Sequence, residues 1–152
     1  MTLPEQLGSL RRTLRRLLTE RLGEQTGRSF MQLLALKAIA EGVRSQAALA
    51  ERLLVDPPAV SRLVDRLEED GLVSRRAGEN RRCVKLELGE KAAGELQLLN
   101  TALEWADGEL QKYLLDTEVT ELKRLVQKLQ DGLAKDEGGP TPGGCGPEEG
   151  TP

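Results

Sequence analysis

The spacing of apolar residues changes from helical to strand-like within residues 45–88, and this change constrains the fold more than any other feature. In the first part, apolar residues recur at steps of three and four, the period of a helix with one buried face. From Leu72 the period falls to two, which places Val84, Leu86 and Leu88 on the inner face of a strand. The pattern predicts helices followed by a β-hairpin.

Residues suited to N-caps divide the helical part into two short helices. Ser45 is expected to cap the first helix. Asp56 is expected to cap the second, with Pro57 at its first position, where a missing N–H costs nothing. Gly71 ends the second helix, and residues 77–81 form the tip of the hairpin. Two short helices separated by two or three residues indicate a helix-turn-helix.

Further helices are predicted on both sides of this unit. Apolar stripes predict helices over residues 4–22 and about 30–41, the latter behind a capping box that begins at Ser29. Gly89 and Thr117 are expected to cap a long helix and the last helix. The predicted class is mainly α with a small β-hairpin.

Composition agrees with this class and excludes several functions. Apolar residues are 38% of the chain but aromatic residues only 2%, so leucine and alanine must build the core of a helical protein. No apolar run approaches the ~20 residues that span a bilayer, so we expect a soluble, cytoplasmic protein without membrane contact. The chain has no histidine, and Cys83 and Cys145 are its only cysteines. We therefore expect no metal, no cofactor, no disulfide and no enzymatic activity.

Charge is distributed unevenly along the chain. The net charge of −3 arises in residues 135–152, a Gly/Pro-rich acidic segment predicted to be disordered. Positive charge is concentrated between Gly71 and Lys85, where one glutamate accompanies five cations, Arg75, Arg76, Arg81, Arg82 and Lys85. Such local bias matters more for nucleic-acid binding than the sum.

The terminal helices carry apolar stripes that have no obvious partner within a small winged domain. An apolar stripe without a partner in its own chain is normally a subunit interface. We therefore predict one domain, residues 1–134, with a lobe at 30–89 and dimerisation helices at 4–22 and 90–134. The leucines expected in the homodimer interface are Leu7, Leu10, Leu14, Leu122, Leu125 and Leu129.

Four segments in order resemble the MarR family of bacterial regulators: 46–53 (QAALAERL), 60–73 (VSRLVDRLEEDGLV), 80–82 (NRR) and 86–88 (LEL). The order of the flanking helices extends the resemblance to about residues 5–134. It implies a winged helix-turn-helix homodimer, joined by its first and last helices. Such a dimer usually represses transcription from a pseudo-palindromic operator until a small-molecule effector or an oxidant releases it.

The resemblance also implies where double-stranded DNA would bind. The start of the second helix of the motif enters the major groove, and Ser61 and Arg62 hold the positions of base contacts, with Arg62 suited to guanine. Arg66 is better placed for phosphate. In the family a wing arginine enters the minor groove beside an aspartate; here these positions hold Arg82 and Asn80. The full set of candidate DNA contacts is Ser45, Asp56, Pro58, Ala59, Ser61, Arg62, Arg66, Arg81 and Arg82.

Three features leave alternatives open. Pro57, Pro58 and Asn80 reduce the donors available to DNA, so a second hypothesis is a helical dimer that acts through protein partners. Cys83 follows the wing arginines, whose charge favours the reactive thiolate and thus oxidant sensing; the alternative is an incidental, half-exposed thiol. Trp105 could line an effector pocket where the terminal helices meet the lobe, although we place it in the interface core.

Overall fold

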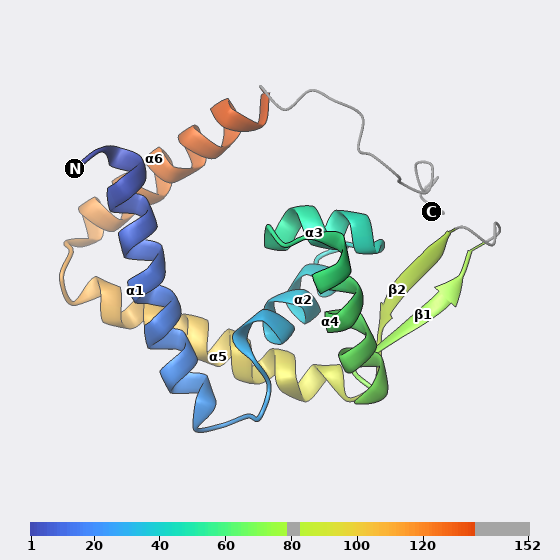
Figure 1. Ribbon diagram of the computed structural model, residues 1–152. Coiled ribbons are helices and arrows are strands. Elements are labelled where there is room, and N and C mark those ends of the chain that lie inside the picture. The colour runs from blue at the N-terminus through green and yellow to red at the C-terminus, as the bar shows by residue number, and fades with distance from the viewer. Residues whose placement is uncertain (79–82, 136–152) are drawn as a thin grey trace, which may run out of the picture.

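The computed structural model describes residues 1–78 and 83–135. Within them the chain forms six helices and one hairpin (Figure 1), which confirms the mainly helical class with a small β-hairpin. The elements are α1 (Leu3–Gly23), α2 (Phe30–Ala40), α3 (Gln46–Leu53), α4 (Pro57–Glu69), β1 (Val73–Ala77), β2 (Val84–Leu88), α5 (Ala92–Gln111) and α6 (Asp116–Lys135). Three sequence predictions lie outside the described residues: the wing arginines Arg81 and Arg82, the pairing state of Cys145, and disorder beyond Lys135.

Local side-chain bonds begin the first two helices. Thr2 and Glu5 form a capping box ahead of α1, and the Thr2 N–H and hydroxyl both donate to the Glu5 carboxylate, at 2.6 and 2.8 Å. These bonds lower the pKa of Glu5, because they favour its ionised form. The predicted box at Ser29 is confirmed: the Ser29 N–H donates to Gln32 Oε1 at 2.9 Å, and the Gln32 N–H donates to Ser29 Oγ at 3.1 Å.

The helix-turn-helix is α3 and α4. Ser45 and Asp56 cap these helices as predicted, accepting the N–H of Ala48 at 3.1 Å and of Ala59 at 2.8 Å. The turn between them contains a residue that the sequence pattern did not single out. Leu54 has a left-handed backbone (φ 55°, ψ 46°) and is 82% exposed.

The hairpin pairs β1 with β2 in antiparallel register, with Val73 opposite Leu88 and Arg75 opposite Leu86. Only part of the predicted inner face is buried. Leu86 is fully buried, whereas Val84 and Leu88 are 38% and 36% exposed. Only the middle of β2 lies against the lobe, where the Leu86 N–H donates to the Arg44 carbonyl at 2.7 Å.

Two predicted N-caps are wrong. Helix α5 begins at Ala92 after Lys91, with no side-chain cap, so Gly89 does not cap it. Gly89 is needed for close approach instead: its N–H donates to the Leu72 carbonyl at 2.8 Å, and a Cβ there would overlap the Gly71 carbonyl. Helix α6 begins at Asp116, so Thr117 lies inside its first turn.

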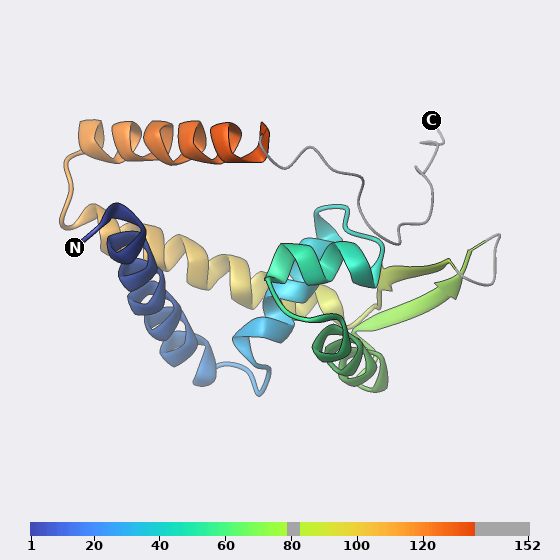
Figure 2. The ribbon, with the colours of Figure 1, turned by 45° about the horizontal axis from the view of Figure 1, so that its top comes forward.

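One apolar core joins the lobe to α1 and α5. Its fully buried side chains are Leu22, Leu33, Leu36, Ile39, Leu49, Val60, Val64, Leu67, Leu72, Leu86 and Leu99. By contrast, α6 contains no buried residue and lies apart from the lobe (Figure 2). None of the helices in the described part of the chain is long and apolar enough to cross a membrane.

Candidate nucleic-acid interface

The first turn of α4 has few backbone groups to offer a ligand. Pro57 and Pro58 carry no N–H. The Ala59 N–H is bound to the Asp56 carboxylate at 2.8 Å, and the Val60 N–H to the Asp56 carbonyl at 3.1 Å. Every donor of this turn is therefore missing or already used, and contacts to DNA from α4 must come from side chains.

Three candidate residues share the exposed face of α4. Pro58, Arg62 and Arg66 are spaced by four, so they lie in one row along the helix, and all three are exposed. Arg62 has no hydrogen bond or ion pair with another described residue. Arg66 pairs with Asp70 at 3.3 Å but is 66% exposed, so this weak surface pair leaves it accessible.

The other candidate DNA contacts in the described part of the lobe are half-buried or already hydrogen-bonded. Ser61 and Ala59 are half-buried beside this row. Ser45 is half-buried at the start of α3, where its Oγ already accepts the Ala48 N–H. The carboxylate of Asp56 is held by its cap bond. Asp56 and Ser45 therefore shape the motif, and Arg62 and Arg66 are the cations that α4 presents.

The charge bias of the hairpin is smaller than the sequence indicates. Arg76 pairs with Glu87 across the strands at 3.0 Å. Arg75 pairs with Asp65 at 2.8 Å and with Glu68 at 3.2 Å, both on α4. Two of the five cations counted in this segment are thus matched by carboxylates. The partners of Arg75 are distant in sequence, so no local pattern indicates these contacts, although alternation along β1 places Arg75 on the same face as buried Val73.

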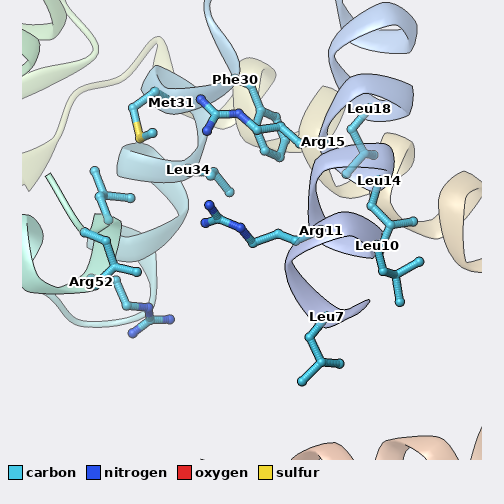
Figure 3. Close-up of a pocket in the computed structure, with 12 residues that line it drawn as sticks. Leu7, Leu10, Arg11, Leu14, Arg15, Leu18, Phe30, Met31, Leu34 and Arg52 are labelled. Atoms are coloured by element: carbon cyan, nitrogen blue, oxygen red, sulfur yellow. The ribbon is translucent and has the colours of Figure 1, made fainter. Parts of the chain in front are cut away.

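An open apolar pocket of about 380 Å³ lies between α1 and the helices α2 and α3 (Figure 3). Its lining is Leu7, Leu10, Arg11, Leu14, Arg15, Leu18, Phe30, Met31, Leu34, Arg52, Leu53 and Leu54. The side chains of Arg11 and Arg15 extend from α1 toward α2, and the Arg15 guanidinium lies 6.0 Å from the centre of the Phe30 ring. The pocket combines apolar walls with three cations.

Trp105 lies outside the lining of this pocket. It is half-buried on α5, and the Arg21 guanidinium lies 4.4 Å from the centre of its ring, which is a cation–π contact.

Four of the six predicted interface leucines, Leu7, Leu122, Leu125 and Leu129, line an apolar groove between α1 and α6, whereas Leu10 and Leu14 line the pocket between α1, α2 and α3. Leu7, Leu10, Leu122, Leu125 and Leu129 are each between 42% and 45% exposed, and Leu14 is half-buried. The groove has a volume of about 610 Å³, and its apolar lining residues are Leu3, Leu7, Leu122, Leu125, Val126, Leu129 and Leu133.

Cys83 lies directly before β2 and is half-buried, and its carbonyl accepts the Gly78 N–H at 2.5 Å. Among residues 1–78 and 83–135 there is no cluster of three histidine, cysteine or acidic side chains that could hold a metal ion.

A helix-turn-helix with a basic exposed face on its second helix, followed directly by an antiparallel hairpin, defines a winged helix-turn-helix protein. The family model described as "MarR family" matches residues 26–82. Over these residues, which hold the helix-turn-helix and the first strand of the hairpin, the chain is similar to the MarR family.

Several solved structures resemble the whole fold. The oxidised form of MarR from E. coli shares 26% identity over 85% of this chain and 95% of its own, with a TM-score of 0.75. The transcriptional regulator BldR from Sulfolobus solfataricus shares 28% over 88% and 93%, with a TM-score of 0.73. A cysteine-to-serine mutant of E. coli MarR complexed with operator DNA shares 26% over 84% and 92%, with a TM-score of 0.72.

Proposed function

We propose that this protein is a homodimeric transcriptional repressor that binds a pseudo-palindromic operator and is released by a small-molecule effector. The observation that carries the proposal is the exposed row of Pro58, Arg62 and Arg66 on α4, next to a hairpin that projects from the lobe (Figure 1). Two such helices, ~34 Å apart in a dimer, would enter successive major grooves of one face of DNA.

The contacts divide into base and phosphate contacts. Arg62 is accessible and long enough for a bidentate contact to guanine, and Arg66 exchanges its pair with Asp70 for a phosphate. Pro58 and Ala59 offer apolar surface to a thymine methyl, and Ser61 and Ser45 support the backbone contacts. Arg81 and Arg82 supply the minor-groove contact of the wing. The operator complex of E. coli MarR supports a DNA-binding role for this fold.

The dimer is expected to form through the α1 and α6 leucines. The exposed apolar groove between these helices supports this, since α6 buries no side chain within one chain. We propose residues 1–134 as the folded unit of the dimer.

The effector pocket is proposed at the junction of α1, α2 and α3. Its apolar walls, with Arg11 and Arg15 on one side, suit an amphipathic anion, whereas Arg52 is paired with Glu41. Leu53 and Leu54 belong both to this lining and to the helix-turn-helix, so an occupant would touch the segment that leads into α4. A small-molecule signal is therefore favoured over oxidation of Cys83. If peroxide weakens DNA binding of the wild type but not of Cys83→Ser, the redox alternative replaces it.

A salt titration with the protein's own promoter duplex tests the proposal. The logarithm of the operator affinity should fall steeply with the logarithm of the salt concentration. The Arg82→Ala and Arg66→Ala variants should each reduce the magnitude of this slope, called the salt slope below, by about one. Arg12→Ala, which removes an exposed cation from α1, is the matched control and should leave the slope unchanged. If the wild type binds no duplex even at low salt, the repressor hypothesis is wrong and the protein acts through protein partners.

A further inference from the structure

Arg75 is the most extensively bonded cation in the described part of the lobe. Its Nε donates to Gln46 Oε1 of α3 at 3.0 Å. Its Nη2 lies 2.8 Å from Asp65 Oδ1 and donates to the Ser61 carbonyl at 3.4 Å, both on α4. These bonds join the hairpin to both helices of the helix-turn-helix.

Glu68 completes the cluster from the last turns of α4. One oxygen, Oε1, accepts from Arg75 Nη1 at 3.2 Å, and the other, Oε2, accepts the backbone N–H of Arg75 at 3.0 Å. The side chain of Arg75 is only 23% exposed. Three of the five guanidinium N–H groups thus donate hydrogen bonds within the protein, and the Asp65 carboxylate adds an ion pair, which leaves little capacity for a phosphate.

The position of Arg75 along the hairpin explains what these bonds do. Buried Val73 and Leu86 hold the base of the hairpin in the core. Beyond them no buried side chain of β1 fixes the direction in which the hairpin points, because Arg76 and Ala77 are exposed. A strand of five residues is about 16 Å long, so a 10° pivot at its base moves its far end by about 3 Å.

We propose that Arg75 is a positioning residue that locks the wing to the recognition helix α4, so that both reach DNA as one rigid unit. The inference rests on the proposed DNA binding. Arginine suits this task because its planar, five-donor fork can bridge three elements, whereas lysine concentrates its charge on one atom.

The adjacent arginine provides a matched control. Arg76 has the same charge, lies one residue further along β1, is 73% exposed and bonds only to Glu87 among the contacts described. If Arg75 and Arg76 act through charge alone, removal of either should weaken DNA binding equally and flatten its salt dependence. If Arg75 positions the wing, the two variants should differ.

The experiment measures the affinity of Arg75→Met, Arg75→Lys and Arg76→Gln for the operator and for a random duplex, across a salt series. We expect Arg75→Met and Arg75→Lys to lose about tenfold in operator affinity, the size of one lost base-pair contact, with an unchanged salt slope. We expect Arg76→Gln to lose at most about threefold, with a flatter slope if it touches phosphate. Thermal unfolding confirms that each variant is folded.

The carboxylate partners give a test that does not depend on the arginine. The double variant Asp65→Asn, Glu68→Gln removes two negative charges near the DNA-facing surface, so charge alone predicts tighter binding. The positioning role predicts that the ratio of operator to random affinity falls by about tenfold while random binding rises. Asp65 is 58% exposed and Glu68 43%, so this variant should fold even if Arg75→Met does not.

The outcomes separate the two proposals. Equal losses for Arg75→Met and Arg76→Gln, or an unchanged ratio in the carboxylate variant, would overturn the positioning role and leave the repressor standing. A wild type that binds no duplex would overturn both. Selective loss of operator binding without a change of slope would establish Arg75 as a positioning residue.

Discussion

Arginines in the lobe differ in what they can contact, and their surroundings decide this more than their charge. Arg62 is open, Arg66 is held by a weak surface pair, and Arg75 is bonded to α3 and α4. Helical spacing alone places Arg62 and Arg66 on one face of α4. The role of Arg75 could not be predicted in the same way, because its partners lie on other elements and are brought to it only by the packing of the hairpin.

The two exposed arginines of α4 should respond differently to truncation. Arg62→Ala is expected to cost about 1–3 kcal/mol in operator binding and to relax the preference at one base pair. Arg66→Ala should weaken binding to all duplexes alike and lower the salt slope by about one. Binding to a set of single-base operator variants checks both. A uniform loss for Arg62→Ala would instead make it a phosphate contact.

Leu54 holds a backbone conformation that its side chain disfavours. A left-handed leucine costs about 1–2 kcal/mol, and asparagine tolerates this region better. Because Leu54 is 82% exposed, little packing is lost when it is replaced. Leu54→Asn should therefore raise the free energy of unfolding by about 1 kcal/mol, measured in urea. Leu54→Ala, which keeps the strain, is the control and should show no such gain.

At the scale of elements, three predicted caps were confirmed, and those predicted at Gly89 and Thr117 were wrong. The caps at Ser29, Ser45 and Asp56 involve residues three positions apart, so the sequence alone contains both partners. Gly89 is required by its approach to Gly71 and Leu72 after the hairpin folds back, and no local pattern reports that. The period-two pattern predicted β2, but not that its ends would extend beyond the lobe.

The cap of α4 matters more than an ordinary N-cap. Asp56 holds the Ala59 N–H in a turn where both preceding residues are prolines, so Asp56→Ala leaves this donor without its bond. The loss should be about 1 kcal/mol of stability, with a further decrease in operator affinity because the first turn presents Pro58. Urea unfolding and operator binding measure the two effects. Asp56→Asn retains a capping oxygen and should recover most of both; if it fails to do so, charge and not capping is responsible.

At the scale of the whole molecule, one chain leaves an apolar surface incomplete. The leucine stripes of α1 and α6 were predictable from spacing, but Leu10 and Leu14 of the α1 stripe line the pocket against α2 and α3 of the lobe. The separation between α6 and the lobe was not predictable, because an amphipathic stripe does not indicate whether its own chain or a second copy covers it. The exposed groove between α1 and α6 favours a second copy.

Disruption of this groove should separate dimerisation from folding. Leu125→Glu with Leu129→Glu places two charges where each side chain is already more than 40% exposed, so the core should remain intact. We expect sedimentation to show a folded monomer, and operator binding to fall steeply because each monomer presents only one recognition helix to a two-fold site. Thr120→Glu adds a charge on the opposite side of α6 and should stay dimeric.

A double variant that remains dimeric would place the interface elsewhere. A monomer that keeps full operator affinity would show that one lobe suffices for DNA binding and would remove the dimer from the proposed mechanism.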